Sequence, residues 1–364
     1  MSTILDLVGR DPKRPPAQPI GQPPIRITVM VDTPMFLAGA NQHHIEHELL
    51  RVPSLRGLLR WWWRAAQSYQ DLERLRNAEA AIWGSLPTKE LPHPQRGVVI
   101  RSTTLPHPRT TTVTGGTGSA EFYLSYGLGE NRGATTGNHT QARPGFAPGQ
   151  TADLEIFAHT DPQRYEVELA LSLLLAFGGL GSRNRRSWGS LSAAHRDGAV
   201  ASRPRSPAEV QTHLGGLLDR VPARTVDGSA VLRSLLGRHA RVETARCAFT
   251  HHELLNTAHA IFKGPDKLHK EAWCFGLPHT RGKGAAQDGP QWVDRRASPI
   301  MLKATRLADD QYALSALLLD GAFLDFVAHA GDATAFQQQR AKLGVFLDRV
   351  RDCQAPMKIM VGRR

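Results

Sequence analysis

Cysteine is scarce in this sequence: its 364 residues include 3, Cys247, Cys274 and Cys353, which lie far apart. Three widely spaced cysteines cannot form a disulfide framework, and without a Cys-x-x-Cys pair they do not form the usual zinc sites. We therefore expect buried structural thiols, with no metal and no cofactor.

Long apolar runs are also missing. No stretch approaches the roughly 20 apolar residues of a membrane-spanning helix, and the first residues hold no apolar signal core. Acidic residues are the minority, 33 Asp and Glu against 45 Lys and Arg, so the formal net charge is +12. This charge favours a polyanionic partner, and nucleic acid is the first choice. We expect a cytoplasmic protein that does not bind membranes.

The chain is long enough for two domains, since domains typically have about 100–200 residues. Proline-rich sequence up to residue 24 predicts an extended leader before the fold begins. The pattern then predicts an N-terminal domain over 25–200, a helical linker over 201–240 and a C-terminal domain over 241–364.

Both domains follow the order β-α-β-β-α-β of a ferredoxin-like fold, which also underlies RNA-recognition modules. Residues 25–31 alternate apolar and polar side chains, as in a strand with one buried face, and Ser54 is placed to cap a helix. The first domain should also contain strands near 97–103, 120–126, 152–158 and 187–194, and a helix near 163–177. The second should contain strands at 241–249, 299–307, 311–319 and 356–361, and helices at 252–262 and 332–351. The predicted fold class is α+β, with two ferredoxin-like domains and basic glycine-rich loops.

The most informative segment is residues 177–191, here named the glycine loop. Its glycines let a backbone approach a ligand closely, and successive N–H groups can form an anion-binding concavity. Its arginines supply positive charge, and its tryptophan offers a flat surface on which a base or ribose could stack. The predicted RNA-binding residues of this loop are Gly178, Gly179, Gly181, Arg183, Arg185, Arg186 and Trp188.

Loops that bind nucleotide cofactors lie between secondary-structure elements in a different order. A Walker or Rossmann loop follows a strand and opens a helix, whereas the glycine loop follows a predicted helix and opens a predicted strand. A flexible, solvated turn is the alternative to RNA binding.

A second basic cluster lies at residues 51–64. A helix start exposes free N–H groups and a positive dipole end, so Ser54, Arg56 and Arg60 together predict a phosphate site. Gly57 would let RNA pack close to the helix. Three successive tryptophans sweep about 200° of helix, so at least one of them, expected to be Trp62, belongs to the core.

The second half of the chain has its own basic stretch. Arg295 and Arg296 follow several glycines there and are further candidate RNA contacts, with a solvated basic face as the alternative.

A histidine cluster invites a metal or an acid–base interpretation. His43, His44 and His47 lie near Glu46, but the order is not the His-Glu-x-x-His of zinc proteases. We expect histidines that face solvent or RNA, and general-base catalysis stays open.

Five segments together resemble a known family: residues 33–40, 51–65 and 83–85, the glycine loop, and residues 295–299. In type and order they are similar to the head subunit of the Cmr effector complex of type III-B CRISPR systems, within the RAMP superfamily. The run 55–60 combined with the later glycine loop is specific to RAMP proteins. The resemblance covers residues 25–195 well.

This resemblance implies a subunit that binds CRISPR guide RNA near its 3′ end, meets target RNA indirectly, packs against other RAMP subunits and does not cut RNA. A metal-independent endoribonuclease that processes guide RNA is the alternative, with one of the three histidines as base. A regulator of duplex DNA is a third class, for which no helix-turn-helix or zinc-finger pattern is present.

Overall fold

The computed structural model describes most of the chain. The described residues are 23–39, 41, 44–45, 49–67, 71–87, 96–103, 108–113, 119–125, 128, 131–132, 139–140, 142–221, 236, 240–247, 249–264, 298–320 and 333–353. The predicted leader up to residue 22 and the predicted strand at 356–361 lie outside them.

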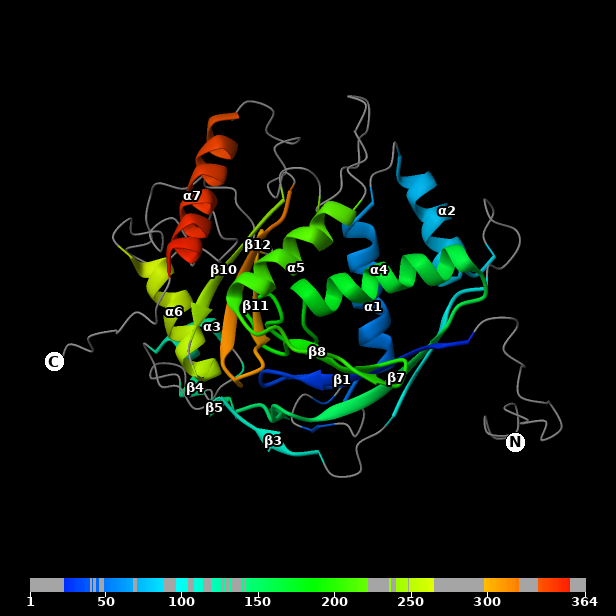
Figure 1. Cartoon of the computed structure of the whole chain (residues 1–364), viewed down its shortest axis with the longest axis horizontal. Coiled ribbons are helices and arrows are strands. Elements are labelled where there is room, and N and C mark those ends of the chain that lie inside the picture. The colour runs from blue at the N-terminus through cyan, green and yellow to red at the C-terminus, as the bar shows by residue number, and fades with distance from the viewer. Residues whose placement is uncertain are drawn as a thin grey trace.

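The first sheet is antiparallel, with the strand order β2-β7-β1-β8-β9. Its strands are β1 (Ile25–Val31), β2 (Val99–Ser102), β7 (Thr151–Phe157), β8 (Leu191–Arg196) and β9 (Ala199–Val200). Ile25, Ile27 and Val29 alternate with more exposed residues along β1, so one face of the sheet is apolar. Helices α1 (Val52–Ala65) and α4 (Asp161–Phe177) share one core with that face, and both lie beside the sheet in Figure 1.

The second sheet has the order β10-β12-β11 and is also antiparallel. Its strands are β10 (Arg241–Cys247), β11 (Ile300–Arg306) and β12 (Tyr312–Leu318). All seven residues of β12 are buried, which requires cover on both faces of the sheet. The covering helices are α5 (Pro207–Arg220), α6 (His251–Lys263) and α7 (Ala333–Asp352).

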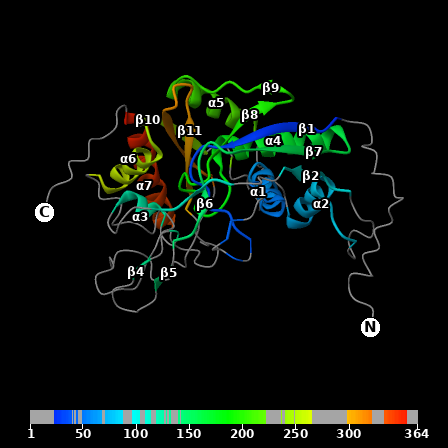
Figure 2. The ribbon, with the colours of Figure 1, turned by 90° about the horizontal axis from the view of Figure 1, so that it is seen from below.

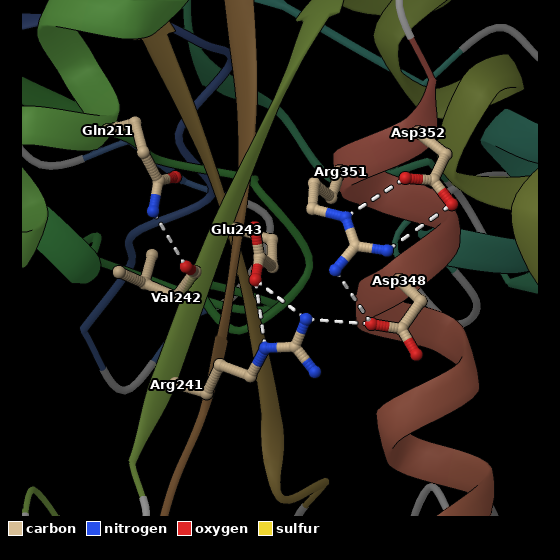
Figure 3. A network of polar contacts seen from close by, with 7 residues as sticks. All are labelled: Gln211, Arg241, Val242, Glu243, Asp348, Arg351 and Asp352. Atoms are coloured by element: carbon tan, nitrogen blue, oxygen red, sulfur yellow. Dashed lines mark hydrogen bonds and ion pairs between the residues drawn. The ribbon is translucent and has the colours of Figure 1, made fainter.

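Polar contacts attach two of these helices to β10 from opposite sides (Figure 3). On α5, Gln211 Nε2 donates to the carbonyl oxygen of Val242 at 2.9 Å. On α7, Asp348 accepts from Arg241 at 2.7 Å, and the same guanidinium binds Glu243 on its own strand. The strand is therefore held between α5 and α7 by more than apolar packing.

The two sheets lie side by side, as Figure 2 shows from below. Buried residues of α5 join the core of the first sheet, together with Met301 and Leu317 of the second. A second core lies between the other face of the second sheet, α6 and α7, and it includes Phe36 and Trp188 from the first half of the chain. The halves thus meet over buried surface.

Short elements complete the fold. Two small sheets of two-residue strands and one short helix lie outside the main sheets: β3 (Thr110–Thr111) with β6 (Gly145–Phe146), β4 (Asn131–Arg132) with β5 (His139–Thr140), and α3 (Ala120–Leu124). In the part of the chain that the structure describes, no helix has the length and apolar character needed to cross a membrane.

The α+β class and the antiparallel sheets are confirmed, but the predicted strand at 120–126 is wrong. Residues 120–124 form α3, because the Ser119 hydroxyl accepts the N–H of Phe122 at 3.0 Å and caps a helical turn. That local cap outweighs the strand preference of Phe122 and Tyr123. A further helix, α2 (Leu72–Trp83), was not predicted; Asp71 caps it by accepting from the N–H of Arg74.

Candidate nucleic-acid interface

The glycine loop has a defined conformation between two other segments. On one side, Ser182 and Gly189 donate backbone bonds to Phe36 and Pro34, at 2.8 and 2.9 Å. On the other side, Ser187 N–H bonds to Leu302 of β11 at 3.0 Å, and Leu302 N–H returns to Arg185 at 2.9 Å. The alternative of a flexible, solvated turn is therefore wrong for this loop.

The glycines of the loop are required by the backbone itself. Gly181 has a φ of +92° and Gly189 a φ of +64°, which side chains disfavour. A Cβ on Gly189 would lie 2.0 Å from the carbonyl oxygen of Leu180, and one on Gly179 would lie 2.6 Å from that of Gly189. At Gly178 a Cβ would meet the Trp62 ring at 2.7 Å. These glycines serve close packing within the chain.

Most N–H groups of the loop are used within the protein. Besides those of Ser182, Ser187 and Gly189, the N–H of Leu180 bonds to Gly189, and that of Ser190 bonds to the Thr33 hydroxyl at 2.9 Å. Such groups are committed and cannot line an anion site. The loop is thus a poor phosphate nest, and its charge must come from its arginines.

Arg185 joins the glycine loop to α1 and β11. Its Nη1 donates to the carbonyl oxygen of Ser298 at 2.8 Å, and its guanidinium carbon lies 5.1 Å from the centre of the Trp61 ring. Burial lowers the pKa of Arg185 from its ordinary value. The two basic clusters that the sequence suggests are therefore brought together through this side chain.

The neighbouring arginines take different positions. Arg186 Nη1 donates to the carbonyl oxygen of Tyr123 at 3.4 Å, which turns the side chain toward α3. Arg183 has a φ of +61° and is half-buried. A positive φ at a residue other than glycine is strained, and such strain often accompanies function.

The predicted stacking role of Trp188 is wrong. The ring is 2% exposed and packs edge-on against Phe36 and His251, with centroid distances of 5.5 and 4.8 Å. Burial lowers the pKa of His251 to about 3, so this contact is with a neutral imidazole. No base can stack on Trp188 in this conformation, and its role is to anchor the loop in the second core.

At the start of α1 the predicted cap is also wrong. The helix begins at Val52, so Ser54 lies in its first turn, where its hydroxyl accepts from Arg51 at 3.2 Å. Arg56 donates to the carbonyl oxygens of Trp83 and Val98, at 3.3 and 2.8 Å, and so ties α1 to the end of α2 and to the approach to β2. Gly57 faces open space, with no atom near its would-be Cβ.

Arg60 and Arg64 share one carboxylate. Glu79 of α2 accepts from Arg60 Nε at 2.7 Å and also from Arg64. The side chain of Glu79 is 10% exposed, while the arginines keep 40% and 38% of theirs exposed. As expected, Trp62 is core; Trp63 is buried as well, and its Nε1 donates to Glu166 at 2.8 Å.

Sequence reasoning missed two charged residues, Asp32 and Lys303, which are both buried. Lys303 Nζ donates to the carbonyl oxygens of Gly178 and Leu191, at 3.0 and 2.7 Å, and thus joins both ends of the glycine loop. Burial lowers the pKa of Lys303 to about 8, and burial raises that of Asp32 to about 6 despite the attraction of Lys303. Lys303 interrupts an apolar strand, which is the one signal the sequence offers.

The structure does not test most of the remaining candidates. Arg295, Arg296, His43 and His47 lie outside the described residues, and His44 is exposed. In the described ranges, no group of three or more His, Cys, Asp or Glu residues is arranged to hold a metal.

Comparisons with known proteins agree with this fold. Residues 28–192 match the model of the RAMP superfamily. No curated protein sequence matches the chain. The crystal structure of apo Cmr1 from Pyrococcus furiosus is similar, with a TM-score of 0.50 and 20% sequence identity over 83% of this chain and 89% of that one.

Two cryo-EM structures of the type III-B Cmr-beta complex also contain a similar chain. The complex bound to cognate target RNA gives a TM-score of 0.56 at 10% identity, over 92% of this chain and 100% of the other. The complex bound to cognate target RNA and AMPPnP, in the presence of ssDNA, gives a TM-score of 0.58 at 11% sequence identity, again over 92% of this chain and 100% of the other. These likenesses concern the fold, and the match to the RAMP superfamily model over 28–192 covers α1, α4 and the glycine loop.

Proposed function

We propose that this chain is a non-catalytic subunit of a type III-B CRISPR effector complex that binds guide RNA near its 3′ end and packs against neighbouring RAMP subunits. The observation that carries the proposal is the family match over 28–192, which includes both basic clusters. The formal net charge of +12 suits a polyanionic ligand. Target RNA is met indirectly, through the guide, in the cytoplasm.

The proposal includes two ferredoxin-like domains, over 25–200 and 241–364, joined by a linker over 201–240. The strand order β2-β7-β1-β8, with helices after β1 and β7, supports this for the first domain. In the second, β10, α6, β11, β12 and α7 follow the same order up to the last helix.

Arginine side chains are the proposed grip on RNA. Arg185 donates to a neutral carbonyl and lies on a neutral ring, so its positive charge is not cancelled by these contacts. Arg60 keeps 40% of its side chain exposed beside the open Gly57 face of α1. Contacts of arginine with phosphate carry no sequence information, so binding should be independent of sequence. Arg183, Arg186, Arg295 and Arg296 are proposed to add to this grip.

One binding series tests the proposal. The full chain is mixed with end-labelled single-stranded RNA or duplex DNA at two salt concentrations, with and without magnesium. The variant Arg183→Ala/Arg185→Ala/Arg186→Ala is compared with the charge-matched control Arg26→Ala/Arg74→Ala/Arg351→Ala, whose side chains are 62%, 66% and 53% exposed.

We expect intact RNA to be retained in preference to duplex DNA, and only the loop variant to lose it. Affinity should fall with salt, with a slope of roughly −0.7 per phosphate neutralised. Shortening of RNA at defined positions would instead favour the endoribonuclease, and His43, His44 and His47 would be substituted next. Equal losses in both triple variants would mean that the loop is not the grip.

A further inference from the structure

A groove crosses the side of the first sheet that faces away from α1 and α4. In Figure 1 these helices lie on one side of β1 and β7, and no described helix lies on the other side. The groove has a volume of about 520 Å³ and is partly open to solvent. Its lining comes from β2, β7, β1, β8 and the turn between β8 and β9. The groove is therefore large enough to hold several side chains of a bound molecule.

Alternation along the strands places charged side chains on this side of the sheet. Arg26 Nε of β1 binds Glu155 of β7 at 3.1 Å, and Arg101 of β2 lies 5.0 Å from the centre of the Phe157 ring. The lining contains two arginines and three carboxylates: Arg26, Arg101, Asp153, Glu155 and Asp197. The groove is thus slightly acidic, in a chain whose formal net charge is +12.

Two of the carboxylates keep oxygen atoms that can accept from a cation. Thr28 donates to one oxygen of Asp153 at 2.7 Å, and within the described part of the chain no group bonds to the other oxygen. Asp197 stands in the Asp-Gly turn between β8 and β9, with a φ of +49°. Arg196 Nε lies 3.9 Å from its carboxylate, and 55% of the Asp197 side chain is exposed. Asp153 and Asp197 lie on opposite sides of β1 and both face the groove.

RNA does not suit this groove. Its carboxylates outnumber its arginines and repel phosphate groups, and the charge of Arg26 is already paired with Glu155. None of the described residues that line the groove is Phe, Tyr or Trp, on which a base could stack. A protein segment that carries positive charge is the better match.

A protein that shares one RNA with this chain needs positive charge for the same reason as this chain does, and two basic surfaces repel each other. An acidic groove lets such a neighbour approach, and ion pairs in the groove fix its position. We propose that the groove docks a segment of a neighbouring RAMP subunit, with lysine or arginine side chains at Asp153 and Asp197. This inference rests on the proposed function and names the surface on which one neighbour packs.

Removal of the two charges tests the groove in the assembled complex. The tagged full chain is purified from its own cells, and the RAMP subunits and guide RNA that accompany it are quantified. Asp153→Asn/Asp197→Asn should retain about tenfold less of one RAMP subunit, because two interfacial ion pairs are lost. Asparagine tolerates the positive φ at 197, so the turn should fold. The matched control, Glu73→Gln/Asp219→Asn, removes two exposed carboxylates outside the groove.

RNA binding by the purified chain separates the docking surface from the proposed function. The groove variant should bind single-stranded RNA as wild type does, and thermal unfolding should show that it is folded. If the groove variant and its control both retain every RAMP subunit as wild type does, the docking surface is wrong and the proposed function stands. If wild type brings down neither guide RNA nor a RAMP subunit, both are overturned.

Photo-crosslinking identifies what occupies the groove, and it decides even if the groove variant does not fold. His195, which is exposed and lines the groove, is replaced by p-benzoylphenylalanine, and Tyr165 on α4, 61% exposed and outside the groove, is the matched position. Irradiation of the complex should attach a lysine- or arginine-bearing peptide of a RAMP subunit at position 195 and not at 165. Attachment at 195 to RNA, to a second copy of this chain or to residues 1–22, or no attachment, would overturn the inference.

Discussion

In α1, Arg60 and Arg64 share the carboxylate of Glu79, whereas in the glycine loop Arg185 donates to a carbonyl oxygen and lies on an indole ring. Both arrangements fix guanidinium groups in place. In α1 one of two positive charges is cancelled, while the contacts of Arg185 cancel none. The acceptor, and not the number of arginines in a segment, thus determines how much charge remains for a polyanion.

The largest effect should come from the loop backbone. Gly189→Ala places a methyl group 2.0 Å from the Leu180 carbonyl oxygen at a φ of +64°, and should lower the free energy of unfolding by about 3 kcal/mol or more. Gly198→Ala, at a φ of +85° with open space around it, is the control and should cost about 1 kcal/mol. Urea unfolding measures both, and equal losses would show that the loop is not tightly packed.

The next effect concerns Lys303, which joins the loop ends. Because its pKa is lowered to about 8 from 10.5, the unfolded chain binds this proton more tightly than the folded one. Stability should therefore rise with pH between about 8 and 10.5 through this group. Lys303→Met has no such proton, so its stability, measured by urea unfolding across this range, should lack that rise. The same pH dependence in both proteins would contradict a buried, charged Lys303.

The carboxyl group of Asp32 should give stability the opposite pH dependence, over a lower pH range. Its pKa is raised from 3.8 to about 6, so the folded chain binds the proton more tightly and this group makes stability fall as pH rises from about 4 to 6. In Asp32→Asn this fall should be absent from urea unfolding data. A wild-type contribution that instead rises over this range would mean that Asp32 is stabilised in its charged form.

Measurements of RNA affinity should distinguish the glycine loop from α1. Arg185→Ala should weaken binding of single-stranded RNA about tenfold at low salt, whereas Arg64→Ala, with its charge shared with Glu79, should change it by less than about twofold. Fluorescence anisotropy on the full chain measures both values. A larger loss for Arg64→Ala would reverse the comparison.

The smallest expected effect is a gain in RNA affinity. Glu79→Gln removes the carboxylate from two arginines and should raise RNA affinity about threefold, since the local charge becomes more positive. The free energy of unfolding should fall by only roughly 1 kcal/mol, because ion pairs contribute little when their arginine side chains are more than a third exposed. Glu168→Gln, which also removes a carboxylate that binds two arginines, Arg164 and Arg196, is the matched control and should leave RNA affinity unchanged.

Much of the fold could be predicted from local patterns. Alternation along 25–31 and the apolar run of α4 predicted a strand and a helix close to those observed. The error at 120–126 arose because one capping hydroxyl, at Ser119, decides between two patterns that the same aromatic residues allow. Helix α2 was missed although Asp71 caps it, because its apolar stripe is weak and interrupted by charge.

The site was harder to predict, since its contacts join distant parts of the chain. The sequence predicts the loop arginines as RNA contacts, which stays a prediction. It could not show that Trp188 turns inward onto Phe36 and His251, or that Glu79 lies beside Arg60. Asp32 and Lys303 are 271 positions apart, from 303 − 32, and neither belongs to a recognisable motif. The ring contacts of Tyr123 with His259 and Phe262 likewise depend on α3 and α6 meeting in space.

The bond between Arg185 and Leu302 also bears on biosynthesis. The glycine loop leaves the ribosome long before β11, yet its backbone is completed by Leu302, and Arg185 is positioned by Ser298. During translation the loop therefore lacks one wall until more than a hundred further residues have been added. A nascent chain that stops short of residue 298 would carry α1 and the glycine loop without the contacts to Ser298 and Leu302 that hold the loop in place.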